Sequence, residues 1–246
     1  MLFDQAEYDL RCEWGLQGLL NLSPISDAVV VVDILSFSTA VDIIVANGAF
    51  VLPYRWKDNS AAQFAEEKHA HVASARRSQV AYSLSPASVR AIPAGTALVL
   101  PSPNGSTLCL SANPASTFTA CFRNAPAVAA HLARSAARVA VIPAGEHWGD
   151  DTLRPCLEDW IGAGGVLSLL AGKRSPEAEL AVAAFERFRG DLAGALSRCG
   201  SGKELVEAGF RCDIELASEY AVSSAVPMLA GDRFINGSSQ TPPMSR

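Results

Sequence analysis

The stretch that decides the fold reads Ala28-Val29-Val30-Val31-Val32-Asp33. A short β-branched run without polar alternation is typical of a strand buried on both faces, as parallel strands are. Apolar residues then recur at helical spacing between Ala40 and Val45, and Asn47-Gly48 is a good end for that helix. The stretch therefore predicts a strand followed by a helix.

The same order repeats along the chain. Strands are expected at 50–52, 97–100, 117–121 and 139–142, and helices at 60–73, 124–136 and 153–171. The region after 172 is predicted to be mainly helical, at 175–188, 190–199, 202–208 and 213–222, before a hairpin of 226–229 with 233–235. Strands that alternate with helices predict an α/β protein with a largely parallel sheet covered on both faces.

Composition narrows the class of protein. The 246 residues are 49% hydrophobic and 18% charged, which excludes a disordered chain, and the net charge is −5. No basic stripe is visible, so we expect no nucleic-acid partner, whereas a small anionic substrate is compatible with this charge. No linker divides the chain. We expect a single domain over residues 1–237 and a disordered tail over 238–246.

Cysteine usage and the apolar segments favour the cytoplasm. The six cysteines form no CxxC pair, which predicts reduced thiols and argues against a zinc site. The acidic start lacks the basic region of a signal peptide. Prolines interrupt the uncharged stretch 91–122, so no membrane-spanning helix is expected. The oligomeric state stays open, with a homodimer as one option.

Polar side chains follow three of the expected strands, in loops 33–39, 102–107 and 145–151. Ligands bind beyond the carboxyl ends of the strands in open α/β sheets. If the three strands are parallel neighbours, all three loops meet at one edge.

The first two loops each place hydroxyls at the start of a helix, where N–H groups suit phosphate. Asp33 adds a carboxylate, a ligand type that Mg²⁺ prefers. In the alternative interpretation these residues only cap turns and helices. The candidate phosphate-binding residues are Ser36, Ser38, Thr39, Asn104, Gly105, Ser106 and Thr107.

The third loop supplies Glu146, and the expected helix after it carries Arg154, Glu158 and Asp159. An exposed i,i+4 pair of Arg154 with Glu158 is the simpler interpretation. We favour a site role for Glu146 and for Glu158 or Asp159, because the acids lie next to a glycine-rich, closely packed segment. The chain has no Gly-x-Ser-x-Gly, P-loop, HExxH or Gly-x-Gly-x-x-Gly motif, which argues against a serine hydrolase and a dinucleotide enzyme.

An ordered series of short motifs resembles the 2-phosphosulfolactate phosphatase family from about residue 27 to 236. The matching stretches are 32–40, 46–49, 83–86, 102–107, 123–125, 142–146, 153–159, 201–205, 209–213 and 223–227. The resemblance implies a three-layer α/β/α fold with a mixed sheet. It also implies a Mg²⁺-dependent phosphatase that hydrolyses (R)-2-phospho-3-sulfolactate, a step towards coenzyme M.

Two positions depart from the family pattern. Many members carry an arginine where this chain has Ser36, and a Gly-Glu-Arg segment where it has Ala75-Arg76-Arg77-Ser78. Both arginines are plausible anion ligands, so the substrate is expected to be (R)-2-phospho-3-sulfolactate or a related phospho-hydroxyacid.

The expected mechanism is direct attack by metal-activated water, with Mg²⁺ held by Asp33 and Glu146. Leu35 stands where a haloacid-dehalogenase-type phosphatase has its second aspartate, which argues against a phosphorylated Asp33. The catalytic candidates are Asp33, Glu146, Glu158 and Asp159, and the candidates for binding the substrate's carboxylate or sulfonate are Arg77, Arg123 and Arg154. The alternative function is non-catalytic binding of an anionic phosphorylated metabolite.

Overall fold

The computed structural model describes residues 3–56, 58–74, 76–78, 81–112 and 116–239. Most strands follow the predicted positions closely. They are β1 (Leu10–Cys12), β2 (Ala28–Val32), β3 (Phe50–Tyr54), β4 (His71–Val72), β5 (Ala97–Pro101), β6 (Ser116–Thr119), β7 (Val139–Pro143), β8 (Glu146–His147), β9 (Leu153–Arg154), β10 (Pro227–Ala230) and β11 (Arg233–Asn236).

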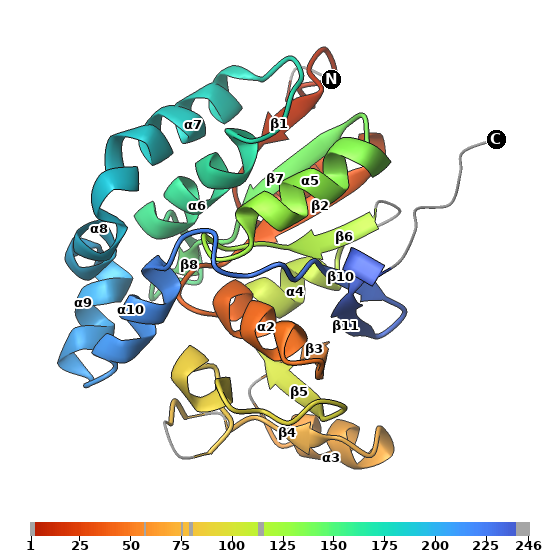
Figure 1. The fold of residues 1–246 in the computed structure, drawn as a ribbon, viewed down its shortest axis with the longest axis vertical. Coiled ribbons are helices and arrows are strands. Elements are labelled where there is room, and N and C mark those ends of the chain that lie inside the picture. The colour runs from red at the N-terminus through yellow and green to blue at the C-terminus, as the bar shows by residue number, and fades with distance from the viewer. Residues whose placement is uncertain (1–2, 57, 75, 79–80, 113–115, 240–246) are drawn as a thin grey trace.

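The helices surround this sheet (Figure 1). They are α1 (Gly15–Leu22), α2 (Phe37–Ala46), α3 (Ser60–Glu67), α4 (Gly105–Cys109), α5 (Ala125–Ser135), α6 (Leu157–Leu167), α7 (Pro176–Phe188), α8 (Leu192–Arg198), α9 (Gly200–Glu207) and α10 (Arg211–Ser218). Short 3₁₀ helices are η1 (Ser23–Ile25), η2 (Pro86–Val89), η3 (Arg189–Asp191) and η4 (Gly237–Ser239).

The described residues form one nine-stranded sheet in the order β1-β7-β2-β6-β10-β11-β3-β5-β4. The β1, β7, β2 and β6 strands are parallel, as are β3, β5 and β4. The hairpin β10–β11 joins these two groups through antiparallel pairing with β6 and β3. The α/β prediction with a mixed, largely parallel sheet is therefore confirmed.

Side chains of β2 alternate between two hydrophobic clusters, which explains the uninterrupted valine run. Val30 and Val32 pack with residues of α5, α6 and α7, whereas Val29 and Val31 pack with residues of α1, α2 and α4. A third, smaller cluster joins α3 to β3 and β5. Figure 1 shows α5, α6 and α7 on one side of the β1–β6 group, and α2 and α4 on the other. Burial on both faces is the reason that this strand needs no polar residue.

The condition that the three strands are parallel neighbours is met only in part. The β2 and β7 strands are neighbours, but β6, β10, β11 and β3 separate β2 from β5. The loop after β5 still reaches Asp33, because α4 packs against the face of β2 and shares a hydrophobic cluster with β2, β3 and β5. The loop after β5 therefore reaches the loops after β2 and β7 through the packing of α4, and not because the three strands are adjacent in the sheet.

The main differences between the predicted elements and the structure lie at three places. The segment before residue 28 contains β1 and α1, which were not predicted. The helix expected over 60–73 ends at Glu67, because His69 adopts a positive φ of 51° and the chain continues into β4. The helix expected from 153 begins at Leu157, since Pro155 favours an extended Arg154, which lies in β9.

The single-domain prediction over 1–237 stays a prediction. Of the expected tail 238–246, Ser238 and Ser239 lie in η4, and 240–246 lie outside the described residues. In the part of the chain that the structure describes, no helix combines the length and apolarity needed to cross a bilayer. All six cysteines are described and none forms a disulfide, as the sequence predicts.

Candidate active site

Asp33 joins two of the three loops. Its carboxylate follows β2 and is 7% exposed. One oxygen accepts a hydrogen bond from the backbone N–H of Phe37 at 3.2 Å, and the other accepts from that of Gly105 at 3.1 Å. Asp33 therefore fixes the start of α2 and the start of α4 relative to the end of β2.

Gly105 is required for this approach. A Cβ at this position would lie 2.3 Å from the ring of Phe37 and 2.8 Å from an Asp33 carboxylate oxygen. The Ser102 hydroxyl also accepts from the Gly105 N–H, at 3.1 Å. Any side chain at 105 would push the loop after β5 away from Asp33, so glycine allows the two loops to touch.

Asn104 joins the second loop to the third. Its amide nitrogen donates to a carboxylate oxygen of Glu146 at 2.9 Å. Asn104 is 8% exposed, and its side-chain oxygen has no hydrogen-bond partner among the described residues. A buried amide oxygen without a partner is costly in a folded protein, which favours a ligand at this point.

Asp159 joins the third loop to the first. One oxygen accepts from the backbone N–H of Ile34 at 2.8 Å, and the other accepts from that of Gly145 at 2.9 Å. Asp159 is buried in the first turn of α6. Burial, and then the nearby charges of Glu158 and Asp33, raise the pKa of Asp159 well above its ordinary value.

These contacts close a ring. The ring runs from Asp33 and Ile34 through Asp159 to Gly145 and Glu146, and returns through Asn104 and Gly105 to Asp33. Three separate loops and one helix are thereby held in a fixed relation. We call these seven residues the acidic ring. The structure brings together Asp33, Asn104, Gly105, Glu146 and Asp159, five of the residues proposed for the site from the sequence.

Three predicted phosphate-binding hydroxyls point into the protein instead. Ser38, Thr39 and Ser106 have no exposed surface. The Ser38 hydroxyl lies 2.6 Å from that of Thr119 and accepts the Asp33 N–H, the Thr39 hydroxyl donates to the Ile34 carbonyl, and the Ser106 hydroxyl donates to the Leu100 carbonyl. Each hydroxyl is thus used in fixing the loop that carries it. Thr107 is half-buried, and its hydroxyl donates to the Ser102 carbonyl at 3.5 Å.

Arg77 is the arginine held against the start of α2. Its guanidinium donates to the Ser36 hydroxyl at 3.0 Å and to Asp213 at 2.6 Å. Asp213 has no exposed surface, and it also accepts from the hydroxyl of Ser85 and the N–H of Ala87. A guanidinium therefore lies at Ser36, the position where the resemblance led us to expect an arginine side chain.

The side chains of Arg123 and Arg154 contact residues outside the acidic ring, although Arg154 stands directly opposite Glu146 in the pairing of β8 with β9. Arg123 pairs with Asp42 at 2.9 Å and with Glu219. Arg154 donates to the Ser201 hydroxyl at 3.4 Å and lies over the ring of Trp148. The i,i+4 pair of Arg154 with Glu158 is absent from the ion pairs of the described residues, because α6 begins only after Arg154.

Glu158 is buried in the first turn of α6, beside two cysteines. Burial and then the Glu158 carboxylate raise the pKa of the Cys199 thiol to about 12. The structure therefore places Glu158 next to α9 and Asp159 in the ring, although the two residues are adjacent in sequence.

The carboxylates do not gather into a site made of acids alone. Within the described residues, no group of three or more His, Cys, Asp or Glu side chains could hold a metal ion. A cation at the acidic ring would need oxygen ligands of mixed type, two carboxylates with the Asn104 amide.

A model of the family described as 2-phosphosulpholactate phosphatase matches residues 17–232. The chain belongs to this family. The resemblance inferred from the motifs is confirmed, and the match covers most of the chain, including all residues of the acidic ring. Phosphatases are phosphoric monoester hydrolases, which identifies the class of enzyme. No curated protein matches the chain.

Two residues of this 2-phosphosulpholactate phosphatase family member hold the site in place but were not proposed as site residues from the sequence. Asp213 positions Arg77, and Ser102 holds the N–H of Gly105. Both lie in motifs that carried the resemblance, so their presence in the motifs was the available signal. Their roles depend on contacts between distant segments and could not be inferred from local spacing.

Proposed function

We propose that this phosphatase uses Mg²⁺ and hydrolyses (R)-2-phospho-3-sulfolactate or a related phospho-hydroxyacid. The observation that carries the proposal is the acidic ring. It links the carboxylates of Asp33 and Glu146 through Gly105 and Asn104, and the buried side-chain oxygen of Asn104 has no partner among the described residues.

The donor set fits the cation. Mg²⁺ prefers hard oxygen ligands and is usually held by one or two carboxylates together with waters and substrate phosphate. Asp33, Glu146 and Asn104 supply two carboxylates and one amide oxygen, and they lie on three loops that hydrogen bonds fix. When bound there, Mg²⁺ would neutralise phosphate charge and lower the pKa of a water.

The protein's own groups would orient the reaction. Asp159 acts as a positioning residue, since both its oxygens hold backbone N–H groups next to Asp33 and Glu146. Arg77, fixed by Asp213, supplies positive charge at the start of α2, where a phosphoryl oxygen or the substrate carboxylate can be bound. The buried hydroxyls of Ser38, Thr39 and Ser106 would keep the loops rigid.

In this proposal water attacks phosphorus and the bond to the alcohol oxygen breaks. The products are inorganic phosphate and the hydroxyacid, whose oxygen takes up a proton. None of the six cysteines is paired in a disulfide, which supports a cytoplasmic enzyme.

The test measures phosphate release from (R)-2-phospho-3-sulfolactate and a panel of phospho-hydroxyacids, with Mg²⁺ and with EDTA. We expect release that EDTA abolishes and Mg²⁺ restores. Calorimetry of Mg²⁺ binding adds a readout that is independent of turnover. Asn104→Ala should weaken Mg²⁺ binding by roughly tenfold, the value of one lost interaction of about 1.4 kcal/mol.

Asn47→Ala is the matched control, since Asn47 is exposed and only donates to the Arg90 carbonyl. Phosphate release that persists in EDTA would contradict the role of the cation. Tight binding of the phospho-hydroxyacids without any phosphate release would instead support the alternative of a non-catalytic binding protein.

A further inference from the structure

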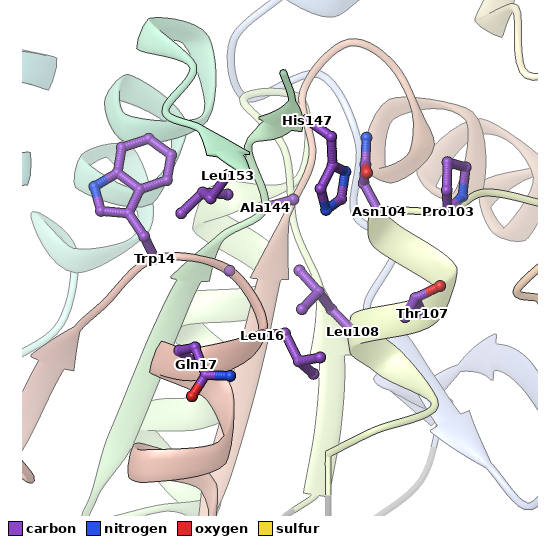
Figure 2. A pocket seen from close by; sticks show the side chains of 11 residues that line it. Trp14, Leu16, Gln17, Pro103, Asn104, Thr107, Leu108, Ala144, His147 and Leu153 are labelled. Atoms are coloured by element: carbon purple, nitrogen blue, oxygen red, sulfur yellow. The ribbon is translucent and has the colours of Figure 1, made fainter. Parts of the chain in front are cut away.

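A pocket of about 170 Å³ opens beside the acidic ring (Figure 2). Three segments form its walls: residues 14–17 at the start of α1, residues 103–108 around the start of α4, and residues 144–153 around β8 and β9. Asn104 belongs both to the ring and to the pocket wall. The pocket is therefore continuous with the place where the proposed reaction occurs.

The lining of this pocket is mainly apolar. Leu16, Leu108, Leu153 and Ala144 contribute to it, and Figure 2 shows Leu16 and Leu108 below the polar side chains of Asn104 and His147. No arginine or lysine is among the lining residues. His147 is the one titratable side chain of the lining, so an ionised sulfonate placed here would lose hydration with no permanent cation beside it, which is unfavourable.

The size of the pocket indicates what it can hold. Apolar cavities of about 150 Å³ accept a molecule as large as benzene. A pocket of about 170 Å³ therefore has room for a branched alkyl group of four carbons. Larger groups would extend into solvent past the exposed Leu16 and Leu153.

The three arginines proposed as anion ligands all have their partners outside the pocket. Arg77 pairs with Asp213, and Arg123 pairs with Asp42 and Glu219. Arg154 turns towards Ser201. None of the three lines the pocket.

We propose that this pocket binds an apolar side chain of the substrate, so that the preferred substrate is a 2-phospho acid with a branched alkyl group in place of the sulfonate. The inference rests on the proposed function, since the phosphate must lie at the acidic ring for the side chain to reach the pocket.

The experiment compares three esters by phosphate release: 2-phospholactate, the phosphate ester of 2-hydroxy-4-methylpentanoate, and 2-phospho-3-sulfolactate. We expect kcat/KM for the branched ester to exceed that for phospholactate by at least about tenfold, the discrimination that an apolar pocket achieves. It should also exceed the value for the sulfonate.

Two variants on α1 test the pocket itself. Leu16→Trp fills the pocket and should reduce the ratio of branched ester to phospholactate towards one. Leu20→Trp is the control, because Leu20 lies one turn away, is similarly exposed (49% against 41%) and does not line the pocket. Leu20→Trp should keep the ratio of the unmodified enzyme.

Equal rates for the branched ester and phospholactate, or a ratio that survives in Leu16→Trp, would overturn the pocket proposal while leaving phosphatase activity intact. If none of the three esters releases phosphate, the proposed function fails. The proposal that the pocket binds an apolar side chain is then tested by calorimetry with the unphosphorylated acids. Tighter binding of 2-hydroxy-4-methylpentanoate than of lactate supports the pocket proposal if Leu16→Trp abolishes the difference. Equal binding of the two acids overturns the pocket proposal.

Discussion

Buried carboxylates in two regions of the molecule are stabilised in different ways. In the first region, which contains Asp42 and Asp213, each buried carboxylate accepts from an arginine, Arg123 or Arg77. In the second region, the acidic ring, Asp159 accepts only from backbone N–H groups. No ion pair of the described residues involves Asp159 or its neighbours Glu146 and Glu158.

The electrostatics of the two regions follow from this difference. Burial raises the pKa of Asp42, but hydrogen bonds from Ser223 and Arg123 oppose the shift. At Asp159, burial and the charges of Glu158 and Asp33 all raise the pKa, and only the backbone N–H groups of Ile34 and Gly145 oppose the shift. The first region carries its own positive charge, whereas the second would be balanced by a cation from outside the chain. That contrast distinguishes a structural network from a candidate metal site.

The largest expected effect is that of Asp33→Asn. It should lower kcat by at least about a thousandfold, because a metal ion contributes several kcal/mol to stabilising the charge of the transition state. Phosphate-release assays and Mg²⁺ calorimetry measure the effect. Asp27→Asn is the matched control, since Asp27 stands at the opposite end of β2 and also accepts two backbone N–H bonds. Equal activity in the two variants would remove Asp33 from the metal site.

The second prediction concerns the region with paired charges. Asp42→Asn leaves Arg123 without its buried partner and should lower the free energy of unfolding by about 3 kcal/mol. Its Mg²⁺ affinity should not change. Urea unfolding measures the loss, and Asp232→Asn is the control, since its ion pair with Lys68 is exposed and worth at most about 1 kcal/mol. A loss of Mg²⁺ affinity in Asp42→Asn would abolish the distinction between the two regions.

The smallest expected effect separates the two glutamates near the ring. Glu146→Gln should reduce kcat by roughly 10–100-fold through weaker metal binding, with an unchanged melting temperature because the side chain is half-buried. Glu158→Gln should instead change the melting temperature, because Glu158 is buried beside Cys199. Full activity of Glu146→Gln together with loss of activity in Glu158→Gln would mean that Glu158 is the functional acid.

Whether a residue of the candidate site could be predicted from the sequence depended on its position in a strand, loop or helix. Asp33, Asn104 and Glu146 each follow a predicted strand, and strand ends in α/β sheets are where ligands bind. The orientation of Ser38 and Ser106 could not be predicted, because a hydroxyl in a first helical turn can face either a ligand or a nearby backbone group.

Contacts between distant segments also could not be predicted from the sequence. The role of Asp159 depends on two N–H groups that lie 125 and 14 residues away. The pocket wall at 14–17 comes from α1, whose short leucine-rich segment precedes the first recognisable strand. The central position of β10 and β11 required knowledge of the sheet order, since hairpin patterns predict pairing within the hairpin and not its neighbours.

The position of that hairpin has a consequence for synthesis on the ribosome. The strands β10 and β11 are the last to emerge, yet they lie between β6 and β3 in the middle of the sheet. Until about residue 236 has left the exit tunnel, the nascent chain holds two half-sheets with open edges, which are surfaces prone to wrong pairing. The sheet becomes continuous only after translation of the final strands. A prematurely terminated chain is therefore an aggregation-prone product, even if it contains every residue of the acidic ring.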